Sequence, residues 1–132
     1  MLVIDASVAV KWVLPEPDSD RAVALRDAGE DLAAPSIVLA EVGNALWKSA
    51  LRGDITKSDA VRAWTAAARH LTDIMPLEAL GERAVALSIE LRQPIYDCFY
   101  LALAERENAA IVTADERMFA AARKARIKVR RL

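Results

Sequence analysis

The stretch from Pro94 to Phe119 constrains the fold of this 132-residue chain more than any other. Residues 98–104 are all apolar or aromatic, which predicts a helix that is buried on most sides. Asp97 opens this helix, and the apolar run Ala109–Val112 after it predicts a buried parallel strand. In an open parallel sheet, ligands bind at the carboxyl ends of the strands. An acid at the start of the helix and another beyond the strand therefore predict polar groups near one sheet edge.

Asp97 and Asp115 each also have a simpler structural interpretation. Asp97 suits the N-cap or first turn of its helix, and Asp115 suits the cap of the helix that follows the strand. For either residue alone, these capping preferences favour the structural interpretation. A functional role depends on further acids reaching the same place.

Short apolar strands alternate with helices along the rest of the chain. Strands are predicted at residues 2–4, 32–34, 73–77, 109–112 and 127–129. Helices are predicted at residues 6–14, 18–28, 38–52, 56–71, 78–92, 97–108 and 116–125. This alternation predicts an α/β fold with a parallel sheet between helical layers and right-handed crossovers. No linker or repeat interrupts it, so residues 1–132 are predicted to form a single domain.

Composition limits the function classes only broadly. The hydrophobic content of 55% argues against disorder, and the net charge of −1 indicates no global affinity for nucleic acid or membranes. Residues 117–131 carry only basic charges, which suits either phosphate contacts or a solvated edge. No apolar run approaches the roughly 18 to 20 residues of a membrane span. The single cysteine, Cys98, excludes an intrachain disulfide and favours a reducing cytoplasm.

Two further acids extend the pattern of Asp97 and Asp115. Asp5 follows the first predicted strand, and Glu41 lies with Asn44 on the polar stripe of an otherwise apolar helix. If the strands before Asp5 and Asp115 are neighbours, these acids lie side by side at a switch point of the sheet. Converging carboxylates repel, so such a site should hold a cation or take up protons. A donor set of oxygens alone favours Mg²⁺ or Mn²⁺ over zinc.

Four motifs, in this order and at this spacing, resemble those of the PIN-domain family. They are Asp5-Ala-Ser7, Glu41 with Asn44, the run Tyr96–Ala104, and Thr113-Ala-Asp115. The resemblance covers essentially the whole chain, and at this length it is to the VapC-type toxins. The chain departs from the pattern at Ala125-Arg126, where many relatives have a glycine. That departure does not affect the acids.

The resemblance implies a three-layer α/β/α fold with a five-stranded parallel sheet in the order 3-2-1-4-5. It implies a Mg²⁺-dependent endoribonuclease, with Mn²⁺ as a substitute, that cleaves RNA by metal-activated attack of water on the phosphodiester. Such a protein is the toxin of a type II toxin–antitoxin system and is held inactive by a VapB-type antitoxin. A homodimer is also implied.

The resemblance further implies a role for each matching residue. Asp5 and Asp97 match the principal metal ligands, and Asp115 matches an acid that supports the metals or their waters. Glu41 matches an acid that acts through water or as a general base. Polar residues that orient these acids are matched by Ser7, Asn44 and Thr113.

Two other functions remain open at this point. A receiver-type phosphoacceptor domain also gathers acids on a parallel sheet, but it needs paired acids near the first strand, where Asp5 stands alone. A non-catalytic PIN-like binding module is the second alternative, and the loss of one or two acids would support it. All four acids are present.

Apolar residues outside the motifs suggest surfaces for partners. Gly43 and Trp47 share a helix face, and together with Trp64 they predict a homodimer interface. Val8 and Trp12, on the helix at 6–14, predict one wall of a groove for an antitoxin tail, although Trp12 fits the core equally well. The aromatic residues of the central helix can stack bases, but helical spacing favours core packing for them; they are Tyr96, Phe99 and Tyr100.

Overall fold

The computed structural model describes all residues from 1 to 132. Its centre is a five-stranded sheet in the order β3-β2-β1-β4-β5, in which every pair of neighbouring strands is parallel. The strands are β1 (Leu2–Ile4), β2 (Leu32–Pro35), β3 (Asp73–Met75), β4 (Ala110–Thr113) and β5 (Val129–Arg131). The predicted sheet and its strand order are confirmed.

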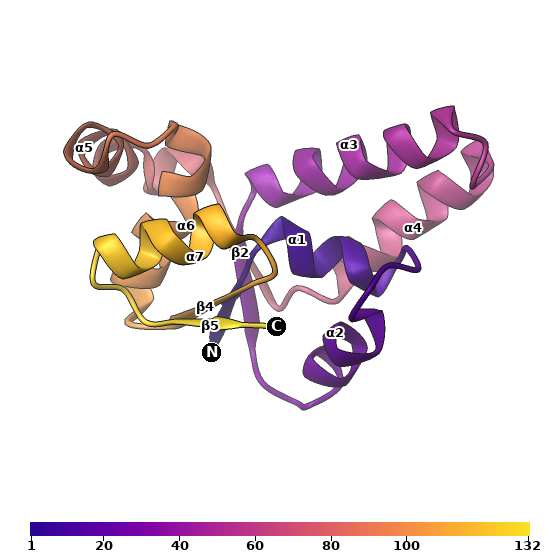
Figure 1. Ribbon diagram of the computed structural model, residues 1–132, viewed down its shortest axis with the longest axis horizontal. Helices are drawn as coiled ribbons and strands as arrows, with labels where there is room; N and C mark the ends of the chain where they lie inside the picture. The colour runs from indigo at the N-terminus through magenta and orange to yellow at the C-terminus, as the bar shows by residue number, and fades with distance from the viewer.

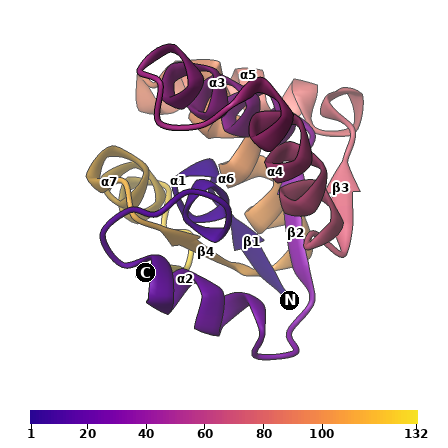
Figure 2. The same cartoon turned by 90° about the vertical axis from the view of Figure 1, so that its right-hand side faces the viewer.

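Helices connect the strands and lie on both sides of the sheet (Figures 1 and 2). They are α1 (Ala6–Ala9), α2 (Ser19–Arg26), α3 (Ile37–Leu51), α4 (Lys57–Arg69), α5 (Gly81–Leu91), α6 (Ile95–Glu107) and α7 (Glu116–Lys124). Two 3₁₀ turns complete the set, η1 (Val10–Trp12) and η2 (Leu77–Ala79). Right-handed crossovers place the helices that follow β1 and β2 on one face and those before β4 and β5 on the other. The three-layer α/β/α architecture is thereby confirmed.

Helix α6 is the centre of the core. Every residue from 98 to 104 is buried, and the helix packs against β1, β2 and β4. This explains why the sequence shows no polar face there, since a helix surrounded by sheet and other helices has no solvent side. It begins at Ile95, so Asp97 lies in its first turn and is not the N-cap. Cys98 packs in this core, as predicted.

The register of β1 and β4 determines which residues meet at the carboxyl edge of the sheet. Ile4 pairs with Val112, and the backbone N–H of Asp5 donates to the carbonyl of Val112 at 3.1 Å. Asp5 therefore lies level with Thr113, the last residue of β4. Because both strands run the same way, the residues just beyond them share one edge of the sheet.

Some boundaries differ from the prediction for local reasons. Arg126 has a φ of 59°, the left-handed conformation that favours glycine, and this turn delays β5 to Val129 instead of residue 127. The helix predicted at 6–14 tightens into a 3₁₀ turn after Ala9. The helix predicted at 78–92 divides into η2 and α5.

The prediction that Val8 and Trp12 line an antitoxin groove is wrong for both residues. Val8 is 0% exposed and Trp12 is 7% exposed. The indole N–H of Trp12 donates to the carbonyl of Ala22 at 3.1 Å, which ties η1 to α2. A buried indole with a satisfied N–H belongs to the core, so it is unavailable as the wall of an open groove.

Gly43 faces Trp64 of the same chain and also lines an apolar groove on the outer side of α3 and α4. An added Cβ at this position would lie 3.6 Å from the Trp64 ring of the same chain, and the Trp64 N–H donates to the carbonyl of Leu39 at 2.8 Å. That distance is an ordinary van der Waals contact, so the packing of α4 on α3 does not require a glycine at this position. Trp47 remains 56% exposed on the outer side of this pair. No helix has both the length and the apolar character needed to cross a membrane.

Candidate functional site

The four acids identified in the sequence come from four different elements and meet at the carboxyl edge of the sheet. Asp5 follows β1, Glu41 lies in the first half of α3, Asp97 lies in the first turn of α6, and Asp115 is the N-cap of α7. Their charges act on one another. Burial is the largest cause of the raised pKa values of Asp5, Glu41 and Asp97, and neighbouring acids add to it. The charge of Asp115 raises the pKa of Asp5, and the charge of Asp5 raises those of Glu41 and Asp97. Three of the acids thus influence Asp5 or are influenced by it.

Asp5 is held by two hydroxyl groups. Ser7 Oγ and Thr113 Oγ1 both donate to Asp5 Oδ2, each at 2.6 Å. Ser7 Oγ also accepts the N–H of Ala114, and Thr113 Oγ1 accepts the N–H of Asp115, each at 3.0 Å. Because each hydroxyl already accepts a backbone donor, its own proton is directed to the carboxylate. The predicted positioning roles of Ser7 and Thr113 thus have a geometric basis.

Burial is the main electrostatic influence on Asp5. The residue is 5% exposed, and loss of hydration raises its pKa despite the two hydroxyl donors, which lower it. Burial among protein atoms alone therefore makes an ionised Asp5 costly. A bound cation would offset that cost.

Glu41 has a single hydrogen-bond partner, the hydroxyl of Tyr100. The Tyr100 hydroxyl donates to Glu41 Oε1 at 2.8 Å and so connects α6 with α3. Burial, followed by the charges of Asp5 and Asp97, raises the pKa of Glu41 to about 7, although the Tyr100 bond lowers it. The Tyr100 ring is 1% exposed, so it cannot stack bases. A carboxyl group with a pKa near neutrality suits proton transfer.

Asp97 faces two weak contacts from neighbouring side chains. Gln93 Nε2 lies 3.5 Å from Asp97 Oδ2, and an Arg117 guanidinium nitrogen lies 3.9 Å from the same oxygen. Partial burial raises the pKa of Asp97, and the charge of Arg117 opposes this effect. Neither contact is short, so the carboxylate keeps free lone pairs for another ligand.

Asp115 does what its structural interpretation predicted. Its Oδ1 accepts the N–H of Arg117 at 2.9 Å and caps α7. Its Oδ2 makes no hydrogen bond in the structure. A cap that uses only one oxygen leaves the other free, so capping and a role in the site are compatible for this residue.

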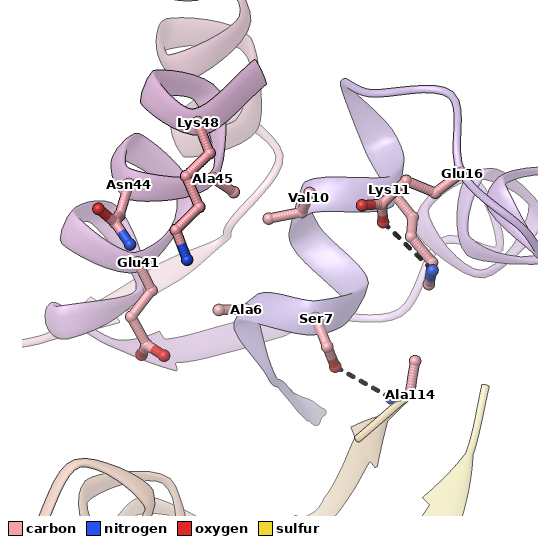
Figure 3. Close-up of a pocket in the computed structure, with 10 residues that line it drawn as sticks. All are labelled: Ala6, Ser7, Val10, Lys11, Glu16, Glu41, Asn44, Ala45, Lys48 and Ala114. Atoms are coloured by element: carbon pink, nitrogen blue, oxygen red, sulfur yellow. Dashed lines mark hydrogen bonds and ion pairs between the residues drawn. The ribbon is translucent and has the colours of Figure 1, made fainter. Parts of the chain in front are cut away.

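A cavity of about 410 Å³ opens between α1 and α3 beside the acids (Figure 3). Its lining is Ala6, Ser7, Val10, Lys11, Glu16, Glu41, Asn44, Ala45, Lys48 and Ala114. Glu41 and Ser7 connect it to the acid cluster, while Asp5, Asp97 and Asp115 lie outside its lining. Asn44 faces the cavity but makes no hydrogen bond to any of the acids. The contact predicted for Asn44 is made by Tyr100 instead.

The donor set can be tested against the divalent metal that the sequence predicts. No three His, Cys, Asp or Glu side chains are grouped so that they alone could hold an ion. Mg²⁺, however, keeps several waters and usually takes only one or two carboxylates together with substrate phosphate oxygens. Asp5 and Asp97 supply two carboxylates with raised pKa values, which a cation would relieve. The residues thus fit a hydrated Mg²⁺ and do not fit a zinc site closed by protein ligands.

The polar contacts that come from α6, α7 and the loop before α6 are not evident from the sequence. Tyr100, Gln93 and Arg117 all contact site acids. The Tyr100 hydroxyl lies within a continuous apolar run and gives no signal distinct from core packing. Arg117 is weakly indicated as a functional residue, because it begins the basic segment that follows Glu116.

Comparison with known proteins is consistent with this geometry. The family model of the PIN domain matches residues 2–125. Ribonuclease VapC9 of Mycobacterium tuberculosis H37Rv is 33% identical over 118 residues, which are 89% of this chain and 88% of that protein. Ribonuclease VapC3 of Pyrobaculum aerophilum is 28% identical over 120 residues, or 89% and 91% of the two chains.

Solved structures share the fold at lower identity. VapBC2 from Rickettsia felis, solved bound to a DNA fragment from its promoter, contains a chain with a TM-score of 0.71 and 20% identity, over 99% of this chain and 98% of that one. PAE2754 from Pyrobaculum aerophilum has a TM-score of 0.70 and 24% identity, over 91% and 78% of the two chains. At these identities the likeness is evidence for the fold alone.

Proposed function

The chain belongs to the PIN-domain family, and on this premise we propose that it is a Mg²⁺-dependent endoribonuclease, the toxin of a type II toxin–antitoxin pair. The observation that carries the proposal is the buried Asp5, fixed by two hydroxyl donors and surrounded by three further acids. Relatives named ribonucleases, which align over most of their length, support RNA as the substrate.

The alternative of a receiver-type phosphoacceptor domain conflicts with the strand order. Receiver domains have the doubly wound order 2-1-3-4-5, whereas this sheet has the order 3-2-1-4-5. The alternative of a non-catalytic binding module lacks support from the acids. All four are present. The raised pKa values of Asp5, Glu41 and Asp97 and the fixed hydrogen bonds to Asp5 and Glu41 are features of a site built for charge.

Each acid has a distinct part in the proposed reaction. Asp5 and Asp97 would hold Mg²⁺, with Asp115 supporting its waters, and the bound ion would neutralise charge on the phosphate and favour ionisation of the attacking water. Glu41 would take the proton of that water on Oε2, because Oε1 is engaged by Tyr100. As the new P–O bond forms, the P–O bond to the leaving ribose oxygen would break, and that oxygen would take a proton from solvent. A pKa of about 7 leaves a sizeable fraction of Glu41 ionised and able to accept a proton at neutral pH.

The cavity beside Glu41 can receive part of the RNA strand. Lys48 and Lys11 line it and supply positive charge next to the acids. Lys11 Nζ is held 3.2 Å from Glu16 Oε2, whereas Lys48 has no acidic partner within 4.0 Å. We therefore assign Lys48 the larger share of the phosphate contacts in this cavity.

We propose that a VapB-type antitoxin silences the nuclease by occupying the same cavity. A short tail carrying an Arg or Lys would pair with Glu41 and its neighbours and prevent metal binding. On the α3 side, Asn44 and Ala45 line the cavity for such a tail, in place of the buried Val8 and Trp12. The presence of toxin–antitoxin complexes from Klebsiella pneumoniae and Rickettsia felis among the structural neighbours supports a partner of this class.

We also propose a homodimer through the outer face of α3 and α4. An apolar groove of about 390 Å³ lies there, with Trp47, Val61 and Trp64 among its lining residues. Trp47 is 56% exposed and Val61 is 61% exposed, and exposed apolar residues that share one groove mark an interaction surface. Trp47→Glu should give a monomer by light scattering, whereas an unchanged mass would contradict this interface.

The nuclease assignment is tested by incubating the purified protein with a mixed RNA substrate. Cleavage should require Mg²⁺, persist in Mn²⁺ and stop when EDTA is added. Internal cuts in a circular RNA would show endonucleolytic action. Cleavage that continues in EDTA at the same rate would contradict the metal-dependent assignment.

A further inference from the structure

A smaller pocket, separate from the cavity between α1 and α3 and from the groove on α3 and α4, lies on the α7 side of the acids. It has a volume of about 280 Å³ and forms where the loop before α6 meets α7. Its lining is Gln93, Pro94, Arg117, Ala120, Ala121 and Lys124. No carboxylate lines this pocket, and its polar side chains are a guanidinium, an ammonium and an amide. Such a lining suits an anion.

Helix α7 aligns the two cations of this pocket. Arg117 and Lys124 are seven residues apart, so two helical turns bring them to the same face. Lys124 has no acidic partner within 4.0 Å, and Arg117 has only the long contact of 3.9 Å with Asp97. Arg131 differs from both, because it is paired with Glu116 at 2.8 Å and lies over the Phe119 ring. Arg117 and Lys124 therefore have no short ion pair within the protein and can bind an external anion.

The pocket borders the proposed catalytic acids directly. Two of its lining residues, Gln93 and Arg117, contact Asp97, one of the two proposed metal ligands. An anion in the pocket would therefore lie next to a phosphate that is being cleaved at the acids. The α1–α3 cavity lies on the Glu41 side, so positive charge flanks the acids on both sides.

We propose that this pocket binds the RNA phosphate adjacent to the one that is cleaved. This inference rests on the proposed function and extends it, because it requires a substrate that continues past the scissile bond. A polyanion is repelled by four acids unless nearby cations compensate. Arg117 supplies a planar set of donors that matches phosphate oxygens, and Gln93 can add a neutral donor.

Lys124 has a structural role that must be separated from phosphate binding. Its Nζ donates at 2.9 Å to the carbonyl of Leu91, which is the last residue of α5. An ammonium group has three donors, so this bond leaves two for a phosphate. Loss of the helix contact would lower the melting temperature, but it would not alter how RNA affinity depends on salt.

The test measures binding of a fluorescein-labelled 12-nucleotide oligouridine by anisotropy, in Ca²⁺, over a series of salt concentrations. Lys124→Gln should weaken binding about 5-fold at 0.1 M salt and reduce the salt slope by about 0.7, the value for one lost phosphate contact on a single strand. Arg117→Gln should act similarly, and the double variant should lose about 1.4 of slope. Arg123→Gln is the matched control on α7, because Arg123 lies outside the pocket.

The outcomes distinguish this pocket from the nuclease assignment. Equal slopes for wild type, Lys124→Gln and Arg123→Gln would overturn the phosphate subsite while leaving Mg²⁺-dependent cleavage intact. Reduced slopes in a protein that cuts no RNA would support the subsite and contradict the nuclease. Wild-type protein that binds no RNA would overturn both.

Discussion

The Tyr100 hydroxyl donates a hydrogen bond of 2.8 Å to Glu41 Oε1, across the space between α6 and α3. It is the only hydrogen bond to this carboxyl, which otherwise sits among like charges. The tyrosine is buried, so its orientation is set by core packing and not by solvent. The interior of the protein thus determines where the proposed general base points.

Tyr100→Phe should remove this orientation while keeping the ring in the core. We expect kcat to fall about tenfold. This is less than the roughly 10²- to 10⁴-fold contribution of a group that itself transfers the proton, because Glu41 is retained. Tyr96→Phe is the control, because Tyr96 is 61% exposed on the same helix. Single-turnover RNA cleavage measures the loss of catalysis, and the melting temperature shows whether the core is damaged. A Tyr100→Phe protein with wild-type kcat would show that the bond does not position Glu41.

In the metal-free protein, Glu41 should lower the free energy of unfolding as pH rises from 4.5 to about 7. In this range the carboxyl is more protonated in the folded state than in the unfolded state. The pKa of Glu41 is about 7 in the folded protein and 4.5 without these surroundings. Between these values the folded state holds more protons, so the free energy of unfolding falls with increasing pH. Because the carboxyl is partly exposed, we expect the free energy of unfolding to fall by only about 1 to 2 kcal/mol over this range.

Glu41→Gln isolates this contribution. The difference in unfolding free energy between Glu41→Gln and wild type should grow from pH 5 to pH 7 and then level off. Urea denaturation in EDTA at a series of pH values measures it. The other titrating groups are common to both proteins, so their contributions largely cancel. A difference that stays constant across this range would contradict the raised pKa.

Thr113→Val should damage both Asp5 and the turn that carries Asp115. The substitution keeps the shape but removes the donor to Asp5 and the acceptor for the Asp115 N–H. Thr113 is 0% exposed, so water cannot replace these bonds, and we expect a loss of about 1 to 3 kcal/mol. Thr65→Val, on the exposed side of α4, should change stability by less than about 0.5 kcal/mol. Equal stability for the two variants would contradict the network.

Two tryptophans should respond differently to truncation. Trp12→Ala leaves a cavity in the core and removes the bond to Ala22, so it should cost about 3 to 5 kcal/mol. Trp47→Ala, at an exposed position, should cost far less. Thermal unfolding of both at low concentration makes the comparison. A Trp12→Ala protein that keeps its stability but binds antitoxin poorly would instead support the prediction that Trp12 lines an antitoxin groove.

Much of the fold could be predicted because its signals are local. The apolar strands, the buried helix at residues 98–104 and the acids at strand ends all follow from short sequence patterns. The sequence predicts the last strand two residues too early, because it does not show that Arg126 adopts a left-handed conformation. A glycine there would have indicated the turn.

The site was predictable to the extent that its residues break an apolar pattern. Glu41 interrupts a hydrophobic helix and was found for that reason. Tyr100 and Trp12 could not be assigned, because an aromatic side chain in an apolar run gives the same signal whether it fills the core, holds an acid or lines a groove. Which of these it does depends on contacts with residues far away in the chain, Glu41 for Tyr100 and Ala22 for Trp12.

The central claim, that Asp5 and Asp97 bind the metal that RNA cleavage requires, is tested most directly by Mn²⁺ binding. Titration calorimetry should show binding to wild type and to the surface control Asp54→Asn, and no binding to Asp5→Asn or Asp97→Asn. RNA should be cleaved by wild type and Asp54→Asn and not by Asp5→Asn or Asp97→Asn. Both site variants should stay folded and should unfold at a higher temperature than wild type in EDTA, because each has lost a buried charge that neighbouring acids repel. Wild-type Mn²⁺ affinity in Asp5→Asn, with cleavage retained, would contradict the account.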